Sequence, residues 1–218
     1  MVRVRSEVEA AWRGLDTILV CAGVSALRPL MEVAGVHNHK GHADFSQASV
    51  DSIRETVRIA DAAQKGNYMG PLVSAVTFIP LLEFTSRSPS VLLVSSLAAI
   101  VGAPTRSLYC STKAASLLLY QSLAIEHPSI RFSFIIPSTV EGDFRASAVD
   151  GGTVREANPN KHGLKREAVA KRCIRAVDSG EKIVMMPVLF SRAGHFLYWI
   201  FPSLIERVAA KKYNYAAQ

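Results

Sequence analysis

SVLLVSSLAAIVGAPTRSLYCSTKAA, residues 90–115, decides the fold of this chain. It opens with a short, nearly unbroken apolar run, which is typical of a strand buried on both faces of a parallel sheet. Two serines and a loop that contains glycine and proline come next. Residues 106–127 are then predicted to form a helix. The stretch therefore predicts a strand joined to a helix, which is the repeating unit of α/β folds.

Three further segments match the opening strand in length and composition: DTILVCAG (16–23), RFSFIIPS (131–138) and EKIVMMPV (181–188). Residues 46–86 are predicted to form one or two helices, and residues 164–179 another. Strands that alternate with helices in this way predict a doubly wound, Rossmann-like parallel sheet with helices on both faces. At 218 residues, 49% of them apolar, the chain is expected to form a single domain over residues 1–218. Ligands of such folds bind beyond the carboxyl ends of the strands.

The formal charge of +7 does not by itself indicate a nucleic-acid partner. The basic residues are scattered along the chain, except in MVRVR, KHGLKREAVAKR and the closing AAKK. No sequence motif of a nucleic-acid-binding module accompanies them. We therefore expect no nucleic-acid partner.

The cysteines and histidines indicate neither disulfides nor a metal site. Three cysteines are widely separated, with no CxxC pair and no secretory signal, which predicts a reduced, intracellular location in the cytoplasm or on the cytoplasmic face of an internal membrane. They are Cys21, Cys110 and Cys173. His37, His39 and His42 share one loop without a cysteine or a fixed carboxylate, so we expect a solvated turn there and no bound metal.

The helix of 106–127 carries the chemistry that the opening stretch suggests. Tyr109 and Lys113 are four positions apart, so they lie on one face and the ammonium is expected to lower the pKa of the phenol. Ser96, thirteen positions before Tyr109, is placed to donate a hydrogen bond to the same substrate oxygen. These groups suit the interconversion of a carbonyl and an alcohol. A tyrosine and a lysine at this spacing also occur on exposed helices without a catalytic role, so the pair alone is not specific.

The context of the pair is more specific. A strand, two serines, a Gly-Pro loop, YxxxK at the start of a helix, and then a strand ending in proline resemble the short-chain dehydrogenase/reductase family of nicotinamide-dependent oxidoreductases. CAG (21–23) resembles the family's Asn-Asn-Ala-Gly strand end, NYMG (67–70) its helix-borne asparagine, and PSTVEGDF (137–144) its Pro-Gly loop. The resemblance covers residues from about 15 to 190.

The resemblance implies four catalytic residues. Tyr109 would be the acid/base, and Lys113 its partner and a ligand of the cofactor's ribose. Ser96 would orient the carbonyl. Asn67 would hold a water that links the lysine to solvent; the alternative is that Asn67 simply marks a helix kink before Gly70.

The resemblance also implies NADP or NAD as cofactor. Cys21, Ala22 and Gly23 would form the strand end on which the adenosine ribose lies, because a large side chain there would obstruct it. The loop that holds Pro137 and Ser138 would continue to Val140, whose backbone amide would contact the nicotinamide carboxamide.

Several positions depart from the family pattern. Cys21 stands in place of an asparagine, Ser138 in place of the loop glycine, and Gly142 in place of a threonine. The family's Gly-rich TGxxxGIG turn, which binds the diphosphate at a helix N-terminus, has no counterpart. Residues 1–15 instead resemble the tail of a helix that precedes the family's fourth strand. We therefore expect an N-terminally truncated version of the fold, weakened cofactor binding and an unpaired apolar edge at strand 16–23.

Together these features predict an NAD(P)-dependent ketone reductase or alcohol dehydrogenase for a small hydrophobic, lipid- or steroid-like substrate. The alternative is a catalytically silent fragment that acts as a membrane-associated or interaction module. A homo-oligomer formed through the helices of 67–86 and 106–127 is implied by the resemblance alone.

Residues 189–212 form the most apolar and aromatic part of the chain. Polar residues interrupt this part, so no apolar run in it is long enough to span a membrane. One interpretation is a helix that lies in a membrane interface, flanked by basic residues. The other is a helical cap over the substrate or a dimer face. The sequence leaves both interpretations open.

Overall fold

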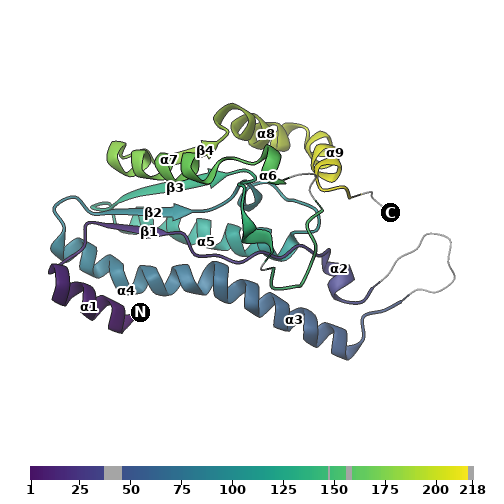
Figure 1. Cartoon of the computed structure of the whole chain (residues 1–218), viewed down its shortest axis with the longest axis horizontal. Coiled ribbons are helices and arrows are strands. Elements are labelled where there is room, and N and C mark those ends of the chain that lie inside the picture. The colour runs from purple at the N-terminus through teal and green to yellow at the C-terminus, as the bar shows by residue number, and fades with distance from the viewer. Residues whose placement is uncertain (37–45, 147, 156–158, 216–218) are drawn as a thin grey trace.

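A computed structural model describes residues 1–36, 46–146, 148–155 and 159–215. His37, His39 and His42 therefore lie outside the described residues. Figure 1 shows the arrangement of the elements. In chain order they are α1 (Val2–Trp12), β1 (Thr17–Val20), α2 (Leu30–Val33), α3 (Val50–Gln64), a π-helical turn η1 (Lys65–Met69), α4 (Gly70–Thr85), β2 (Ser90–Val94), η2 (Leu97–Ala99), α5 (Ser107–Glu126), β3 (Arg131–Pro137), η3 (Asp143–Arg145), α6 (Pro159–His162), α7 (Arg166–Ser179), β4 (Ile183–Met186), α8 (Val188–Ile200) and α9 (Pro202–Lys212).

The four strands form one parallel sheet in the order β1-β2-β3-β4. Each strand lies within one of the four apolar segments seen in the sequence, and the helices between them match the predicted ones. In the register, Leu92 pairs with Leu19 on one side and with Ser133 on the other. Parallel strands need a crossover between them, and here long helical segments provide it. The predicted α/β sheet is confirmed.

Helices cover both faces of the sheet, as Figure 1 shows with α4 and α5 below it and α7 above it. Successive residues of a strand point to opposite faces. Val91 and Leu93 accordingly belong to the core cluster between the sheet and the helices α4 and α5. Leu92 belongs to the cluster between the sheet and α7. Phe134 and Ile135 of β3 divide in the same way. Such strands have no polar face, which explains their unbroken apolar sequence.

The segment from Val50 to Thr85 is continuous through α3, η1 and α4, and it is long and apolar enough to span a bilayer. Its apolar character has another explanation in this fold. Ala75, Ile79 and Leu82 are buried in the core cluster against the strands. The α4 part of the segment therefore packs against the sheet as part of the core.

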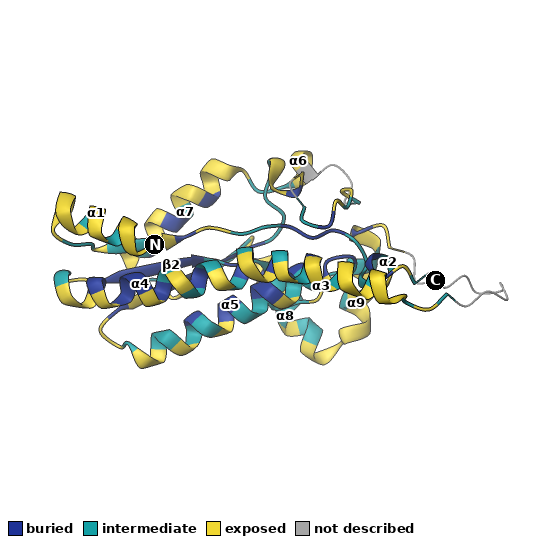
Figure 2. Cartoon of the chain, turned by 90° about the horizontal axis from the view of Figure 1, so that it is seen from below, coloured by how far each residue is buried: buried dark blue, intermediate teal, exposed yellow. Residues whose placement is uncertain are grey.

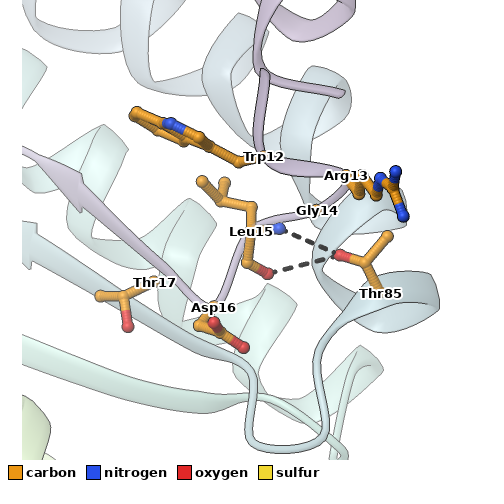
Figure 3. Close-up of a pocket in the computed structure, with 7 residues that line it drawn as sticks. All are labelled: Trp12, Arg13, Gly14, Leu15, Asp16, Thr17 and Thr85. Carbon is orange, nitrogen blue, oxygen red and sulfur yellow. Dashed lines mark hydrogen bonds between the residues drawn. The ribbon is translucent and has the colours of Figure 1, made fainter. Parts of the chain in front are cut away.

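The turn between α1 and β1 holds the amino end of the sheet. Gly14 lies so close to α4 that a Cβ atom there would be 2.6 Å from the Cβ of Thr85. The backbone N–H of Leu15 donates to the Thr85 hydroxyl, and the same hydroxyl lies near the Leu15 carbonyl oxygen (Figure 3). A cavity of about 390 Å³ lies at this turn, at the amino end of β1. It is remote from the carboxyl ends of the strands, where ligands of this fold class bind.

β1 forms an edge of the sheet, because within the described residues it pairs only with β2. Leu19 is 51% exposed there. The helix α1 has no buried residue, and most of its surface is exposed in Figure 2. A helix ahead of strand 16–23 and an apolar edge at that strand were both expected from the sequence.

The C-terminal residues form two helices, α8 and α9, which meet at Phe201 and Pro202 (Figure 1). Pro202 occupies the first position of α9, where its missing N–H costs nothing. Neither helix has the roughly 20 residues that a helical membrane span needs.

Candidate active site

The carboxyl ends of the strands open into a cavity of about 840 Å³. Ser96 enters it from the end of β2, Tyr109 and Lys113 from the first turns of α5, and Pro137 from the end of β3. Cys21 and Gly23 reach it from the end of β1. Residues separated by more than 100 positions in the chain therefore meet at one place, as the parallel topology requires.

Tyr109 is buried at the head of this cavity with 6% of its surface exposed. Its hydroxyl lies close enough to the Ser96 side chain for that side chain to favour the ionised phenol. The Ser96 hydroxyl also accepts a hydrogen bond of 3.2 Å from the Ala98 N–H, which caps η2. The two hydroxyls that the sequence placed on one substrate oxygen thus lie side by side.

Lys113 lies in the same cavity, 4% exposed. Its ammonium donates a hydrogen bond of 2.9 Å to the carbonyl oxygen of Val94, the last residue of β2. Burial lowers the pKa of Lys113 to about 8, and the sulfur of Cys21 opposes this shift. A lysine in this range exchanges its proton close to neutral pH.

The electrostatics of Tyr109 differ from the expectation that Lys113 lowers its pKa. Burial raises the pKa of the phenol, and among the opposing influences the guanidinium of Arg106 comes first, followed by the hydrogen bond from Ser96 and the guanidinium of Arg145. Lys113 is not one of the groups that shift it. The physical reason is that Lys113, with a pKa of about 8, has already lost its charge in the range where a phenol of raised pKa ionises.

Asn67 lies in the π-helical turn η1 and is fully buried. Its amide pairs with the backbone of Val24, accepting from the N–H at 2.8 Å and donating to the carbonyl oxygen at 3.0 Å. It also donates to the Thr112 hydroxyl of α5 at 3.0 Å. Asn67 therefore joins the loop after β1 to the helix that carries Tyr109, and the irregular turn in the helix is what presents it.

The strand end at residues 21–23 approaches the site closely. A Cβ atom at Gly23 would lie 3.0 Å from the Asn67 oxygen and 3.4 Å from the Lys113 nitrogen. Gly23 therefore leaves open a space that any side chain would fill. Cys21 lines the cavity beside it, whereas Ala22 is exposed and does not line the cavity.

The loop after β3 forms another wall of the cavity through Pro137, Ser138 and Val140. A short parallel bridge to Leu164 holds this loop. Its hydrogen bonds are made by the N–H groups of Leu164 and Glu141, so the bridge does not use the Val140 N–H. Gly142 has a φ of 112°, in the region that favours glycine.

These features fit the nicotinamide half of a dinucleotide. Tyr109 and Lys113 supply polar groups, and Gly23, which was expected beside the adenosine ribose, leaves open space next to Lys113. The Ser95 hydroxyl is buried on the cavity wall without a hydrogen-bond partner in the described part of the chain, which suits a polar ligand group. No Gly-rich turn precedes a helix N-terminus within the described residues. In the same ranges, no group of three or more potential metal ligands occurs.

Sequence reasoning missed Arg106, which lines the cavity, and Asp150, which is outside the cavity lining. Arg106 precedes Tyr109 by three positions, so a helical spacing was available to find it. Asp150 had no such indication; its carboxylate accepts hydrogen bonds of 2.6 and 2.7 Å from the N–H groups of Leu27 and Arg28 and fixes the loop after β1.

α8 and α9 were expected to form either a cap or an interfacial helix. Their inner faces line the cavity with apolar side chains, including Leu197, Ile205 and Val208. Their outer faces expose Leu189 and Trp199, which are 84% and 76% exposed. The pair of helices thus covers the cavity on one side and presents an apolar surface on the other.

A family model described as short chain dehydrogenase matches residues 1–151. An Arabidopsis thaliana protein named 11-beta-hydroxysteroid dehydrogenase-like 4A is 29% identical over 113 residues, which cover 51% of this chain and 34% of that protein. The zebrafish (Danio rerio) dehydrogenase/reductase SDR family member 7B is 26% identical over 209 residues, covering 90% and 64%. The chain thus spans about a third of the plant relative's length.

Solved structures share the fold. An alcohol dehydrogenase from Thermococcus sibiricus, complexed with 5-hydroxy-NADP, superposes with a TM-score of 0.61 at 20% identity over 84% of this chain and 67% of that one. A short chain dehydrogenase/reductase from Burkholderia phymatum, in complex with NAD, gives a TM-score of 0.68 at 14% identity over 91% and 72%. At these identities the likeness establishes the architecture of the sheet and its helices.

Proposed function

Because the chain belongs to the short-chain dehydrogenase/reductase family of oxidoreductases, we propose that it interconverts a hydrophobic ketone and its secondary alcohol. The observation that carries this proposal is that Ser96 and Tyr109 line the same apolar cavity, where the Ser96 side chain favours the ionised form of Tyr109. Lys113, buried in the same cavity, is the third residue proposed to take part in the reaction.

In the direction of reduction, a bound reduced nicotinamide supplies the hydride that becomes attached to the carbonyl carbon. The Ser96 hydroxyl donates a hydrogen bond to the carbonyl oxygen and fixes its position. Tyr109 gives its phenolic proton to that oxygen as the C=O bond becomes a single bond, so the product is the neutral alcohol. Lys113, with a pKa of about 8, is the proton donor that restores the Tyr109 phenol.

NADP or NAD is the proposed cofactor. The structurally similar Thermococcus and Burkholderia proteins were solved with these two dinucleotides, which supports the assignment. Tyr109 and Lys113 would hold the nicotinamide ribose, Gly23 would admit the cofactor beside them, and the Val140 N–H would contact the carboxamide. The described residues include no Gly-rich turn before a helix N-terminus, so we expect these residues by themselves to bind the diphosphate weakly.

A lipid- or steroid-like substrate suits the cavity. Its wall formed by α8 and α9 is apolar, so a substrate with a large apolar surface would gain the most from entering it. The name of the plant relative, a hydroxysteroid dehydrogenase-like protein, supports the same class.

The test is a fluorescence titration of the purified chain with NADPH and NADH, followed by turnover assays with steroid and fatty ketones. We expect saturable binding, retained in Tyr109→Phe, and turnover that Tyr109→Phe abolishes. Tyr215→Phe is the matched control, because Tyr215 does not line the cavity. Equal turnover by Tyr109→Phe and the unsubstituted chain would refute the assignment of Tyr109.

A second candidate function is a catalytically silent interaction module. The uncovered edge of β1, with Leu19 exposed, favours it because such an edge pairs readily with another strand. A flat titration with both dinucleotides, together with vesicle or protein binding, would select this function over the oxidoreductase.

We also propose that the outer faces of α8 and α9 contact a membrane surface, on the cytoplasmic side of an internal membrane. Trp199 and Leu189 are exposed there, and the basic Arg207 and Lys211 lie nearby in sequence, a composition that suits an anionic interface. With Trp12→Phe, Trp199 is the remaining tryptophan, and its emission should shift to the blue with phosphatidylserine vesicles. No shift would count against this contact.

A homo-oligomer through α4 and α5 is proposed from their exposed apolar residues. Val76 is 71% and Leu118 66% exposed on these helices. Sedimentation equilibrium should detect a dimer that Leu118→Glu weakens. Ile174→Glu on α7, which is on the opposite face of the sheet, should leave the dimer intact; equal weakening by both substitutions would argue against this interface.

A further inference from the structure

A buried arginine that has no role in the reaction proposed above lies just before the N-terminus of α5. Arg106 immediately precedes the helix and is only 4% exposed. The central carbon of its guanidinium lies 4.4 Å from the centre of the Tyr109 ring, over its face. On another side, the ring of Phe144 meets Tyr109 edge-on at 6.1 Å. The Tyr109 ring is thus held between a cation and an aromatic side chain.

The guanidinium is fixed from a distant part of the chain. Its Nη2 donates a hydrogen bond of 3.0 Å to the hydroxyl of Ser25, which is fully buried. The carbonyl oxygen of Ser25 in turn accepts from the Val149 N–H at 2.9 Å. Ser25 belongs to the loop that Asn67 holds one residue earlier, at Val24. The arginine therefore connects Tyr109 to the loop on which the cofactor is expected to lie.

The backbone before Arg106 is strained in a way that aims this side chain. Arg106 N–H donates to the Ala103 carbonyl oxygen at 3.3 Å, closing a turn with Pro104 and Thr105 at its centre. Thr105 has a φ of 65°, a conformation that favours glycine and is unusual for a β-branched residue. Such strain persists only where the surrounding contacts over-determine it, and here Thr105 is 5% exposed.

The charge beside Tyr109 is permanent. An arginine remains protonated at any pH a folded protein tolerates, whereas Lys113 exchanges its proton near pH 8 and points to Val94. The other groups that act on Tyr109 are Ser96 and Arg145, which also favour the ionised phenol, and the thiol of Cys110, which opposes it.

We propose that Arg106 is a positioning residue for the proposed reaction: its guanidinium, held by Ser25, fixes the face of the Tyr109 ring and favours the ionised phenol oxygen beside Ser96. The proposal rests on the proposed role of Tyr109. It assigns to Arg106 the electrostatic part that the sequence pattern assigned to Lys113.

The test measures the ionisation of Tyr109 without any turnover. Biosynthetic replacement of tyrosine by a fluorinated tyrosine lowers the pKa of the phenols, which brings the Tyr109 midpoint closer to the range where proteins remain folded. Fluorine NMR then follows each phenol, and Tyr109→Phe identifies the resonance of Tyr109. In Arg106→Met the midpoint for Tyr109 should rise by about one pH unit or more, as expected for loss of a neighbouring cation.

Three further variants make the result specific. Arg106→Lys should restore part of the shift, because it keeps the charge. Ser25→Ala should raise the midpoint by less than Arg106→Met, because it keeps the charge and loosens its position. Arg54→Met, on the exposed surface of α3, removes an equal charge far from the site and should leave the midpoint unchanged.

The outcomes separate this proposal from the proposed function. An unchanged midpoint in folded Arg106→Met overturns the role of Arg106, whether or not the chain turns over substrate. A raised midpoint in a chain without turnover supports the role of Arg106 and contradicts the enzyme. If Arg106→Met does not fold, the comparison of Arg106→Lys and Ser25→Ala decides, and unchanged midpoints in both overturn the proposal.

Discussion

Replacing Lys113 with methionine should stabilise the fold, because the lysine is an ammonium kept in a buried place. The pKa of Lys113 falls from 10.5 to about 8 on folding. Each unit corresponds to about 1.4 kcal/mol, so the charged side chain costs the folded state about 3 kcal/mol near neutral pH. The hydrogen bond to the Val94 carbonyl oxygen is lost in the variant, at a cost of about 1 kcal/mol. Lys113→Met should therefore gain about 2 kcal/mol in free energy of unfolding near pH 7.

The two pKa values of Lys113 also set how the stability difference between the two chains changes with pH. Below about pH 8 the lysine is protonated in both the folded and the unfolded chain, so the full cost is present. Between 8 and 10.5 the unfolded chain binds more protons than the folded chain, and the stability of the unsubstituted protein rises with pH. The advantage of Lys113→Met should therefore shrink as the pH rises through this window.

Urea unfolding of both chains at several pH values across this window is the assay. Lys171→Met, an exposed position on α7, is the matched control and should change stability little at any pH. If Lys113→Met and the unsubstituted chain show parallel stability profiles, the ammonium does not carry the burial cost and the reasoning fails. The variant should also lose turnover, because the same buried amine restores the Tyr109 proton.

Three other substitutions test how the fold is held. Gly14→Ala places a Cβ atom against Thr85 and should lower the free energy of unfolding by about 1–3 kcal/mol in urea titrations. Gly102→Ala places its Cβ atom in open space and should not lower it. Equal effects of the two substitutions would contradict the close approach of Gly14 to Thr85. Phe134→Ala, at a fully packed core position, should cost about 3–5 kcal/mol by the same measurement, and a loss below about 1 kcal/mol would mean that β3 is not at the centre of the core. Asn67→Ala should accelerate hydrogen exchange at the Val24 amide, because the acceptor of that amide is the Asn67 side chain. Unchanged exchange at Val24 would show that Asn67 does not hold the loop after β1.

Several features that are unfavourable for folding lie together in one part of the molecule. A buried amine, a strained Thr105 and a Ser95 hydroxyl without a partner among the described residues all lie around the head of the cavity. Each is unfavourable for folding by itself, and such features cluster at functional sites. The apolar strands and the long helices supply the stability that tolerates them.

The order of strands and helices was available from the sequence alone. Strands buried on both faces require continuous apolar runs, and these runs marked β1, β2, β3 and β4 within a few residues of their ends. The neighbourhood of Ser96, Tyr109 and Lys113 followed in the same way, because helical spacing and the end of β2 are local properties of the chain. Membership of the family could be inferred from that local pattern, and the match over residues 1–151 confirms it.

Contacts between distant segments were decided only by the tertiary structure. Arg106 meets Ser25 across 81 positions, and Asp150 holds Leu27 across 123. No periodicity or spacing records which loop a side chain will meet. The hydrogen bond of the Lys113 ammonium is of the same kind, because its acceptor, the Val94 carbonyl oxygen, lies 19 positions away in the chain. Local pattern thus determined which groups gather at the cavity, whereas packing across the sheet determined which cation lies on Tyr109, since that depends on how loops far apart in sequence come together.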